Sequence, residues 1–173
     1  AADGDIIFSS DDGSGSTTTY LTIDGGDSSQ TIITQDGSYA FATLTFDNVD
    51  YVTVKNLTVE NTGTNGDAIL FYESDHNTVT SCVSRVDANS TAFGVYNISF
   101  SGSPTANFTV ANTHYNTIEN THIIGGYYGI RMYGSSGQLT KGNRILNNDM
   151  DSVYYYGIYT FYVDSIDIEG NNI

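Results

Sequence analysis

The chain has 173 residues, of which 39% are hydrophobic and 13% aromatic, enough for a single domain with a buried core. Its 5 Lys and Arg against 20 Asp and Glu give a formal net charge of -15, which excludes nucleic-acid binding through a basic patch and disfavours binding to an anionic membrane surface. Because only 14% of the residues are charged, a disordered polyelectrolyte is excluded as well, and no apolar run is long enough for membrane insertion.

Short alternating runs fill the chain, and no window carries a helical stripe of apolar residues. In residues 1–41, alternating runs lie at 5–8 and 20–26. Further along, period-2 runs separated by Thr, Ser, Asn, Gly and Asp predict strands of a few residues each, at 31–33, 44–46, 52–54, 79–81 and 166–168. The pattern therefore predicts an all-β protein with frequent turns.

The runs also repeat one another. Five segments align without gaps, at 51–59, 76–84, 115–123, 142–150 and 165–173. One apolar anchor occupies the same place in each segment: Val54, Val79, Ile118, Ile145 and Ile168. Neighbouring anchors are about 25 residues apart except between Val79 and Ile118, and a unit of that length without a helix indicates one coil of a β-solenoid. A β-sandwich would also give many short strands, but not the same nonamer five times.

A second element follows each segment, with a small residue before a β-branched one, at 68–69, 94–95, 129–130 and 157–158. Coils that stack about 4.8 Å apart turn equivalent residues into ladders. We therefore expect ladders of the five anchors, an Asn ladder of Asn77, Asn116 and Asn143, and a second Asn register of Asn56, Asn120 and Asn147.

The long interval between Val79 and Ile118 predicts one lateral insertion near 97–112. Two strand-like runs there surround a Gly/Pro turn, which is typical of a hairpin or loop that leaves the coil. Insertions in solenoids gather on one face and are often where binding occurs. The single cysteine, Cys82, lies in an alternating run and is expected to be a small buried side chain.

These units resemble the repeats of the pectin-lyase-like superfamily, of the NosD-like and carbohydrate-binding-and-hydrolase types. The resemblance rests on the Asn-Thr-Ile/Val turn-strand at 77–79 and 116–118 and on Tyr-Tyr-Gly-Ile at 127–130 and 155–158, and it covers 42–173 better than 1–41. It implies a right-handed, single-stranded parallel β-helix, here of about six coils, with its entry coils in 1–41, at the runs 5–8 and 20–26. It also implies a module of a large secreted bacterial surface protein, although the same coil serves lyases, hydrolases, tailspikes and adhesins.

Dense aromatics in the last two coils form the strongest candidate surface for a ligand or partner. Because strand neighbours alternate faces, Tyr154, Tyr155 and Tyr156 cannot all point inward. The tyrosines expected to form this surface are Tyr127, Tyr128, Tyr133, Tyr155, Tyr159 and Tyr162. Such a stripe would stack on sugar rings or pack against a partner chain.

Metal and catalytic candidates are weaker. Asp24 and Asp27, like the run 11–15, loosely resemble turns that bind Ca²⁺, so Ca²⁺ is the one cofactor considered. NosD-like relatives have been linked to copper, but the three histidines, Cys82 and the two methionines form no cluster in this sequence. Related lyases use a basic residue beside Ca²⁺, for which Arg131 is a candidate, and related hydrolases use paired carboxylates.

We therefore expect a non-catalytic structural or adhesive β-helix module, secreted to the cell surface or into an extracellular fibre. The alternative is a carbohydrate-active or carbohydrate-binding β-helix. The sequence ends within an ordinary coil pattern, which suggests a piece of a longer chain or a coil that docks on another copy or module. Glycans are the other expected partner.

Overall fold

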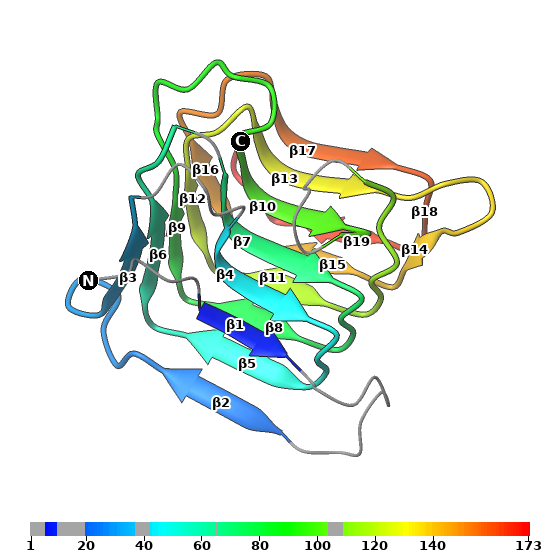
Figure 1. The fold of residues 1–173 in the computed structure, drawn as a ribbon, viewed down its shortest axis with the longest axis horizontal. Coiled ribbons are helices and arrows are strands. Elements are labelled where there is room, and N and C mark those ends of the chain that lie inside the picture. Colours follow the sequence, from blue (N-terminus) through cyan, green and yellow to red (C-terminus); the bar gives the residue numbers. More distant parts are fainter. Residues whose placement is uncertain (1–5, 10–19, 37–41, 65, 104–108) are drawn as a thin grey trace.

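The computed structural model describes residues 6–9, 20–36, 42–64, 66–103 and 109–173, and every regular element within these ranges is a β-strand. The strands pair in parallel and form three long sheets that wind around one core (Figure 1). Sheet A contains β1 (Ile6–Ser9), β4 (Ala42–Asp47), β7 (Asp67–Tyr72), β10 (Tyr96–Ser101), β13 (Tyr128–Tyr133) and β17 (Tyr156–Phe161). Sheet B contains β2 (Leu21–Asp24), β5 (Val52–Lys55), β8 (Thr78–Thr80), β11 (Thr117–Glu119), β15 (Arg144–Leu146) and β19 (Asp167–Glu169).

Sheet C contains β3 (Ile32–Gln35), β6 (Thr58–Asn61), β9 (Val83–Arg85), β12 (His122–Ile124) and β16 (Asp149–Asp151). A short pair, β14 (Thr140–Lys141) and β18 (Val163–Asp164), flanks the stack. One strand from each long sheet makes one coil, as in β5, β6 and β7. The prediction of an all-β parallel β-helix is confirmed, with about five turns in the described residues where we expected about six. No helix in this part of the chain is long and apolar enough to cross a membrane.

The core consists of ladders of identical or similar side chains. In sheet B, Val54 pairs in register with Val79, Val79 with Ile118, Ile118 with Ile145, and Ile145 with Ile168. The first four of these anchors are fully or almost fully buried, and Ile168, in the last coil, is 46% exposed. Burying a Val or Ile side chain contributes about 1.5–3 kcal/mol, so each ladder holds its neighbouring coils together.

Sheet A adds a second ladder inside the core. Phe46, Phe71 and Phe100 occupy one register and are fully buried. Their rings stack with centroids 4.5 and 4.7 Å apart and nearly parallel planes. This separation matches the spacing of paired strands, so in-register stacking satisfies the backbone hydrogen bonds and the ring contacts together.

The turn between sheets A and B holds the Asn ladder of Asn77, Asn116 and Asn143, all buried. Each side-chain Oδ1 accepts a hydrogen bond from a backbone N–H of the preceding coil: Val52 N to Asn77, Asn77 N to Asn116, and Asn116 N to Asn143, each at 2.9 Å. Each Nδ2 donates to a carbonyl of the same preceding turn, for Asn116 the carbonyl of Ser74 at 2.8 Å. The amides therefore replace the backbone partners that a tight turn cannot supply.

The second Asn register plays a different role from the one expected. Asn56, Asn120 and Asn147 have φ of 56°, 49° and 54°, so they are the left-handed turn residues between sheets B and C. The buried amide ladder lies one residue later. Asn148 Oδ1 accepts from Thr121 N at 3.0 Å, and Asn171 Oδ1 accepts from Asn148 N at 2.9 Å.

The register of sheet A corrects one alignment made from the sequence. Ile69 pairs with Ile98, and Ile98 pairs with Ile130, so the partner of 129–130 is Asn97-Ile98 and not Gly94-Val95. Tyr96–Ser101 is consequently β10, an in-coil strand, and not the first part of a loop that leaves the coil. The connections from β9 to β10 and from β10 to β11 are both longer than the corresponding connections of the other coils. Within the expected insertion at 97–112, residues 104–108 lie outside the described residues.

Candidate functional site

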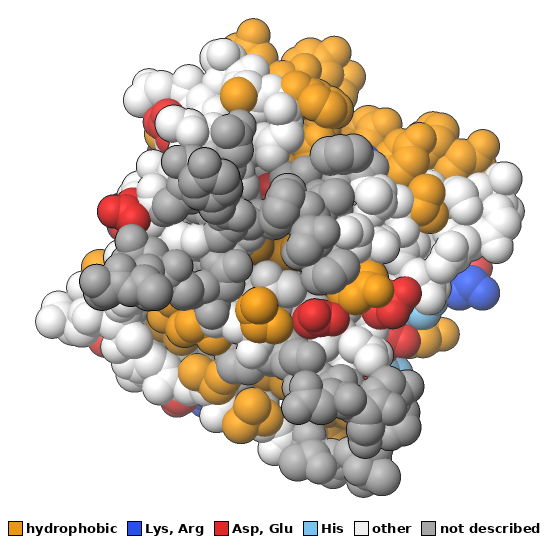
Figure 2. All heavy atoms as spheres, viewed as in Figure 1, with side chains coloured by type: hydrophobic (Ala, Val, Ile, Leu, Met, Phe, Trp, Pro, Cys, Tyr) orange, Lys and Arg blue, Asp and Glu red, His pale blue; other side chains and the backbone are white. Residues whose placement is uncertain are grey.

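The tyrosines expected to form a surface gather on the outside of sheet A, over β13, β17 and the connections that lead into them. Phe93, Tyr154, Tyr156 and Phe161 lie beside these six tyrosines, and we call the ten residues together the aromatic surface. Figure 2 shows hydrophobic side chains along the upper right edge of the molecule, over β13 and β17. Tyr154, Tyr155 and Tyr162 are 57%, 54% and 46% exposed, whereas Tyr128, also expected at the surface, is only 7% exposed. A contiguous aromatic surface of this kind marks an interaction site more often than scattered rings do.

Strand pairing arranges these rings in rows. Tyr128 pairs with Tyr156 across β13 and β17, and the two rings stack with centroids 5.9 Å apart and planes 8° apart. Tyr128 also stacks on Tyr159 at 5.0 Å and 13°. Tyr133 pairs with Phe161, and their rings lie 5.1 Å apart. The rings are thus held in fixed, nearly parallel orientations by the register of the sheet beneath them.

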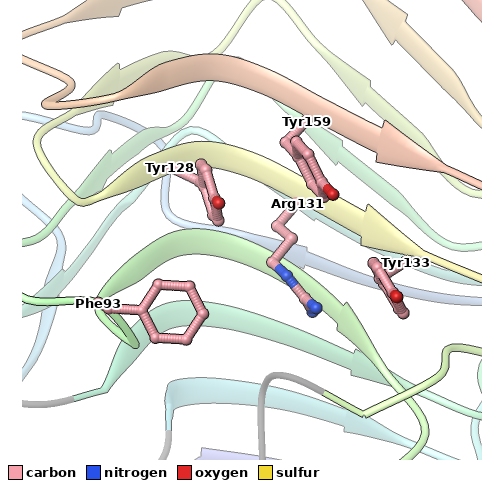
Figure 3. Close-up of a pocket in the computed structure, with 5 residues that line it drawn as sticks. All are labelled: Phe93, Tyr128, Arg131, Tyr133 and Tyr159. Atoms are coloured by element: carbon pink, nitrogen blue, oxygen red, sulfur yellow. The ribbon is translucent and has the colours of Figure 1, made fainter.

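An open pocket with a volume of about 350 Å³ lies within the aromatic surface. Its lining consists of Phe93, Tyr128, Arg131, Tyr133 and Tyr159. Figure 3 shows the Arg131 side chain between Tyr128 and Tyr133, with Tyr159 beside it and Phe93 across the pocket. β13 supplies three of these residues, β17 supplies Tyr159, and the connection before β10 supplies Phe93.

Arg131 is the charged group of this pocket and is only 5% exposed. Its guanidinium carbon lies 5.2 Å from the ring centroid of Tyr96 and 4.9 Å from that of Tyr133, which are cation–π distances. Burial lowers the pKa of Arg131, while Tyr96 and Asp67 act in the opposite direction. A guanidinium stays protonated in proteins, so the pocket keeps a positive charge with planar, fork-shaped donors.

Two further buried groups lie beneath the pocket, Tyr96 and Asp67. Burial raises the pKa of Tyr96 to about 12, so its hydroxyl stays protonated and can donate a hydrogen bond. Asp67 is fully buried, and its two carboxylate oxygens accept hydrogen bonds from the backbone N–H of Tyr96 at 3.1 Å and from the Ser99 hydroxyl. This carboxylate is thus held by the protein and does not line the pocket.

Sequence reasoning missed Phe93 and Tyr96. Tyr96 shares the register of Tyr128 and Tyr156. The sequence alignment places Gly94-Val95, and not Asn97-Ile98, opposite 129–130, so it does not align Tyr96 with those tyrosines. Phe93 is 67% exposed in the connection before β10, where no periodic pattern singles it out. Its ring contacts Tyr96 and Tyr127 edge to face, which places it at the pocket.

The expected Ca²⁺ candidates have partners within the protein. Asp24 Oδ1 accepts from Asn56 Nδ2 and from the backbone N–H of Gly26, both at 2.9 Å, and Oδ2 lies 3.2 Å from Lys55 Nζ. The hydrogen bond from Asn56, with smaller contributions from Gly26 and Lys55, lowers the pKa of Asp24 to about 2. Asp27 accepts from Ser29 N at 2.8 Å. Ca²⁺ binding at Asp24 and Asp27 stays a prediction, and the run 11–15 lies outside the described residues.

Copper would need His, Cys or Met donors that converge, and every such residue of the chain lies in the described ranges. His114 Nδ1 accepts from Lys141 N and its Nε2 pairs with Asn112, each at 3.1 Å. His76 is stacked between the Tyr51 and Tyr115 rings in the equivalent turn of the preceding coil, where its backbone N–H donates to the His114 carbonyl at 3.1 Å. Cys82, Met132 and Met150 are buried in the core. No group of three or more His, Cys, Asp or Glu among the described residues could hold a metal ion. The side chains present therefore do not fit a copper centre.

Comparison with known proteins gives one match. Residues 28–173 match a family described as periplasmic copper-binding protein (NosD), and the match spans all but the first strands of the solenoid. Searches of the curated proteins and of the solved structures each returned no match.

Proposed function

The chain belongs to the NosD family, and we propose from its site that it is an exported, non-catalytic β-helix module that binds glycans through the aromatic surface. The family's description as periplasmic supports a location outside the cytoplasm. The observation that carries the proposal is the stacked pair of Tyr128 and Tyr159, which lines an open pocket, with Tyr156 stacked on Tyr128 beside it.

Sugar rings and tyrosine rings suit one another physically. A pyranose ring presents a face of C–H groups that packs on an aromatic ring, while its hydroxyl groups need polar partners at the rim. The Tyr128 and Tyr159 rings offer the apolar contact, and the Arg131 guanidinium offers hydrogen-bond donors within the same pocket. Because Tyr128 and Tyr156 are paired in register on neighbouring strands about 4.8 Å apart, a chain of sugars can contact more than one ring.

Binding without catalysis is favoured by the position of Asp67, the carboxylate whose charge acts on Arg131. A general acid or base must come within hydrogen-bonding reach of the bond that reacts. Asp67 is fully buried, and both of its oxygens are held by Tyr96 and Ser99. Adhesion at a cell surface, or assembly with other copies or modules, extends the same proposal, since either could use an aromatic surface that holds glycans.

A polysaccharide-binding assay tests the proposal. The intact chain is run in affinity electrophoresis through gels that contain neutral or acidic polysaccharides, beside the variants Tyr155→Ala and Tyr159→Ala. Loss of one aromatic contact removes about 0.5–1.5 kcal/mol, so we expect each variant to bind about two- to tenfold more weakly. Tyr20→Ala is the matched control, because Tyr20 is an exposed tyrosine of the first coil, remote from the aromatic surface.

The proposal fails if no polysaccharide retards the wild-type chain. It also fails if Tyr20→Ala weakens binding as much as Tyr159→Ala does. Circular dichroism of each variant shows whether the fold is retained, so that a loss of binding is attributed to the ring and not to unfolding.

A further inference from the structure

We propose that the pocket over Arg131 is a binding site for a carboxylate-bearing ring, with the carboxylate paired to the guanidinium and the ring packed against Tyr128 and Tyr159. This inference rests on the proposed function and names the chemical class of its ligand. The ring can be an acidic sugar or an aromatic carboxylate, since both present an anion next to a flat apolar face.

Three other basic side chains form exposed ion pairs on sheets B and C, and their surroundings differ from those of Arg131. Lys55, Arg85 and Arg144 lie on sheets B and C and form ion pairs with Asp24, Glu60 and Asp167, at 3.2, 2.8 and 3.4 Å. These side chains are substantially exposed, so such pairs contribute little binding energy. Arg131 instead lines a pocket with aromatic walls, where reduced solvent contact strengthens an interaction with an anion.

The rings on either side prepare the guanidinium for a planar partner. Tyr96 and Tyr133 lie 5.2 and 4.9 Å from its carbon, and these contacts restrict the side chain to one region of the pocket. A guanidinium with a fixed plane can form two parallel hydrogen bonds to one carboxylate, which a lysine cannot do. Little side-chain entropy is then lost on binding.

A second observation concerns the Tyr96 hydroxyl, which is buried and has no hydrogen-bond partner among the described residues. Tyr96 contacts three residues that line the pocket: its ring lies 6.0 Å from Phe93, 5.2 Å from Tyr128 and 5.2 Å from the Arg131 guanidinium carbon. A buried hydroxyl without a partner costs about 1–3 kcal/mol. A ligand oxygen at the base of the pocket would accept this hydrogen bond.

The negative charge of Asp67 raises the pKa of Arg131, against the effect of burial, so Asp67 already stabilises the guanidinium from within the protein. Its oxygens already accept hydrogen bonds from Tyr96 N and Ser99 Oγ. A guanidinium carries five N–H donors, so it can face an internal carboxylate on one side and a ligand on the other. The long-range charge of -15 opposes an anion, but screening limits that opposition to about 8 Å at physiological salt.

Isothermal titration with small probes tests the assignment. The intact chain is titrated with glucuronate and glucose, and with benzoate and benzyl alcohol, two pairs that differ in the carboxylate. We expect each acid to bind at least tenfold more tightly than its neutral partner. Arg131→Gln should abolish that preference. Arg144→Gln, which removes an exposed arginine of sheet B, should retain it.

A second measurement keeps the test decisive if Arg131→Gln does not fold. Glucuronate added to the wild-type chain should shift the NMR signal of the Arg131 Nε–H group, and binding should weaken as salt is raised, whereas glucose should show no salt dependence. Equal affinity for glucose and glucuronate overturns the carboxylate assignment and leaves the glycan proposal standing. Binding of benzoate alone upholds the carboxylate site but contradicts glycan binding. Absence of binding to all four probes overturns the assignment.

Discussion

Removal of one buried amide from the Asn ladder tests how this solenoid is held together. Asn116 is fully buried, and its side chain makes two strong hydrogen bonds to the preceding coil. Oδ1 accepts from Asn77 N at 2.9 Å, and Nδ2 donates to the Ser74 carbonyl at 2.8 Å. Asn116→Ala therefore leaves one buried donor and one buried acceptor without these partners.

The expected cost follows from those two groups. Each buried polar group that loses its partner costs about 1–3 kcal/mol, so the variant should lose about 4 kcal/mol of unfolding free energy. That loss is a large share of the about 5–15 kcal/mol typical of a folded domain. Urea denaturation followed by far-UV circular dichroism measures it, and faster hydrogen exchange at the Asn77 amide should accompany it.

Asn120→Ser is the matched control. Asn120 is an exposed turn residue with φ of 49°, and Ser81 occupies the same register one coil earlier with φ of 54°. The control should change stability by less than about 0.5 kcal/mol. If Asn116→Ala falls within 1 kcal/mol of the control, the buried amides do not carry the coil-to-coil hydrogen bonding, and the account of the ladder is wrong.

Three further predictions concern the turns and the metal question. Gly142→Ala should destabilise the fold by about 1–2 kcal/mol in thermal melts, because Gly142 has φ of 62° and an added Cβ would collide with the Tyr115 ring. Gly137→Ala is the control and should be neutral, because a Cβ added there meets nothing within 4 Å. The pKa of Asp24 is lowered from its usual 3.8 to about 2, so the ionised carboxylate stabilises the fold above pH 3.8, and this contribution is lost as the pH falls toward 2. Asp24→Asn lacks the carboxylate, so its melting temperature should fall less steeply over that pH interval than the melting temperature of the wild type. Dialysis against Cu(II) followed by metal analysis should leave well below one copper per chain, and a stoichiometric, tightly held copper would contradict the conclusion drawn from the donor side chains.

Most of the fold was predictable because a solenoid repeats its own sequence. The anchors from Val54 to Ile168 share a register since each coil faces only its neighbours, and gapless alignment of the nonamers reproduces strand pairing. The second Asn register was harder to interpret. Asn147 and Asn148 are adjacent, and only the backbone shows that the first is a turn residue and the second a buried ladder residue.

The register of β10 could not be read from composition for a physical reason. One position of sheet A holds a small residue in three coils: Ala68, Gly129 and Gly157. In the coil of β10 the same position holds Asn97. Asn97 fits there because its side chain is satisfied inside the core. Its Oδ1 accepts from Ser84 Oγ at 2.5 Å, and its Nδ2 donates to the Ile124 carbonyl at 2.6 Å. A polar residue that completes its hydrogen bonds can thus replace a glycine, and a search for small residues passes it by.

The same rule of register explains why aromatic side chains, and not the donors that copper prefers, converge in the described part of the chain. In a parallel β-helix, side chains converge when they occupy one register in successive coils or neighbouring positions on one face. Tyr96, Tyr128 and Tyr156 meet this condition, as do Arg131 and Tyr159, so their rings and charge share one pocket region. Cys82 points into the core toward the Val54 carbonyl, His122 begins β12 near Asp149, and His76 lies in the turn before β8. No three of these donors converge among the described residues, whereas the side chains of the proposed site lie at neighbouring positions of β13 and β17.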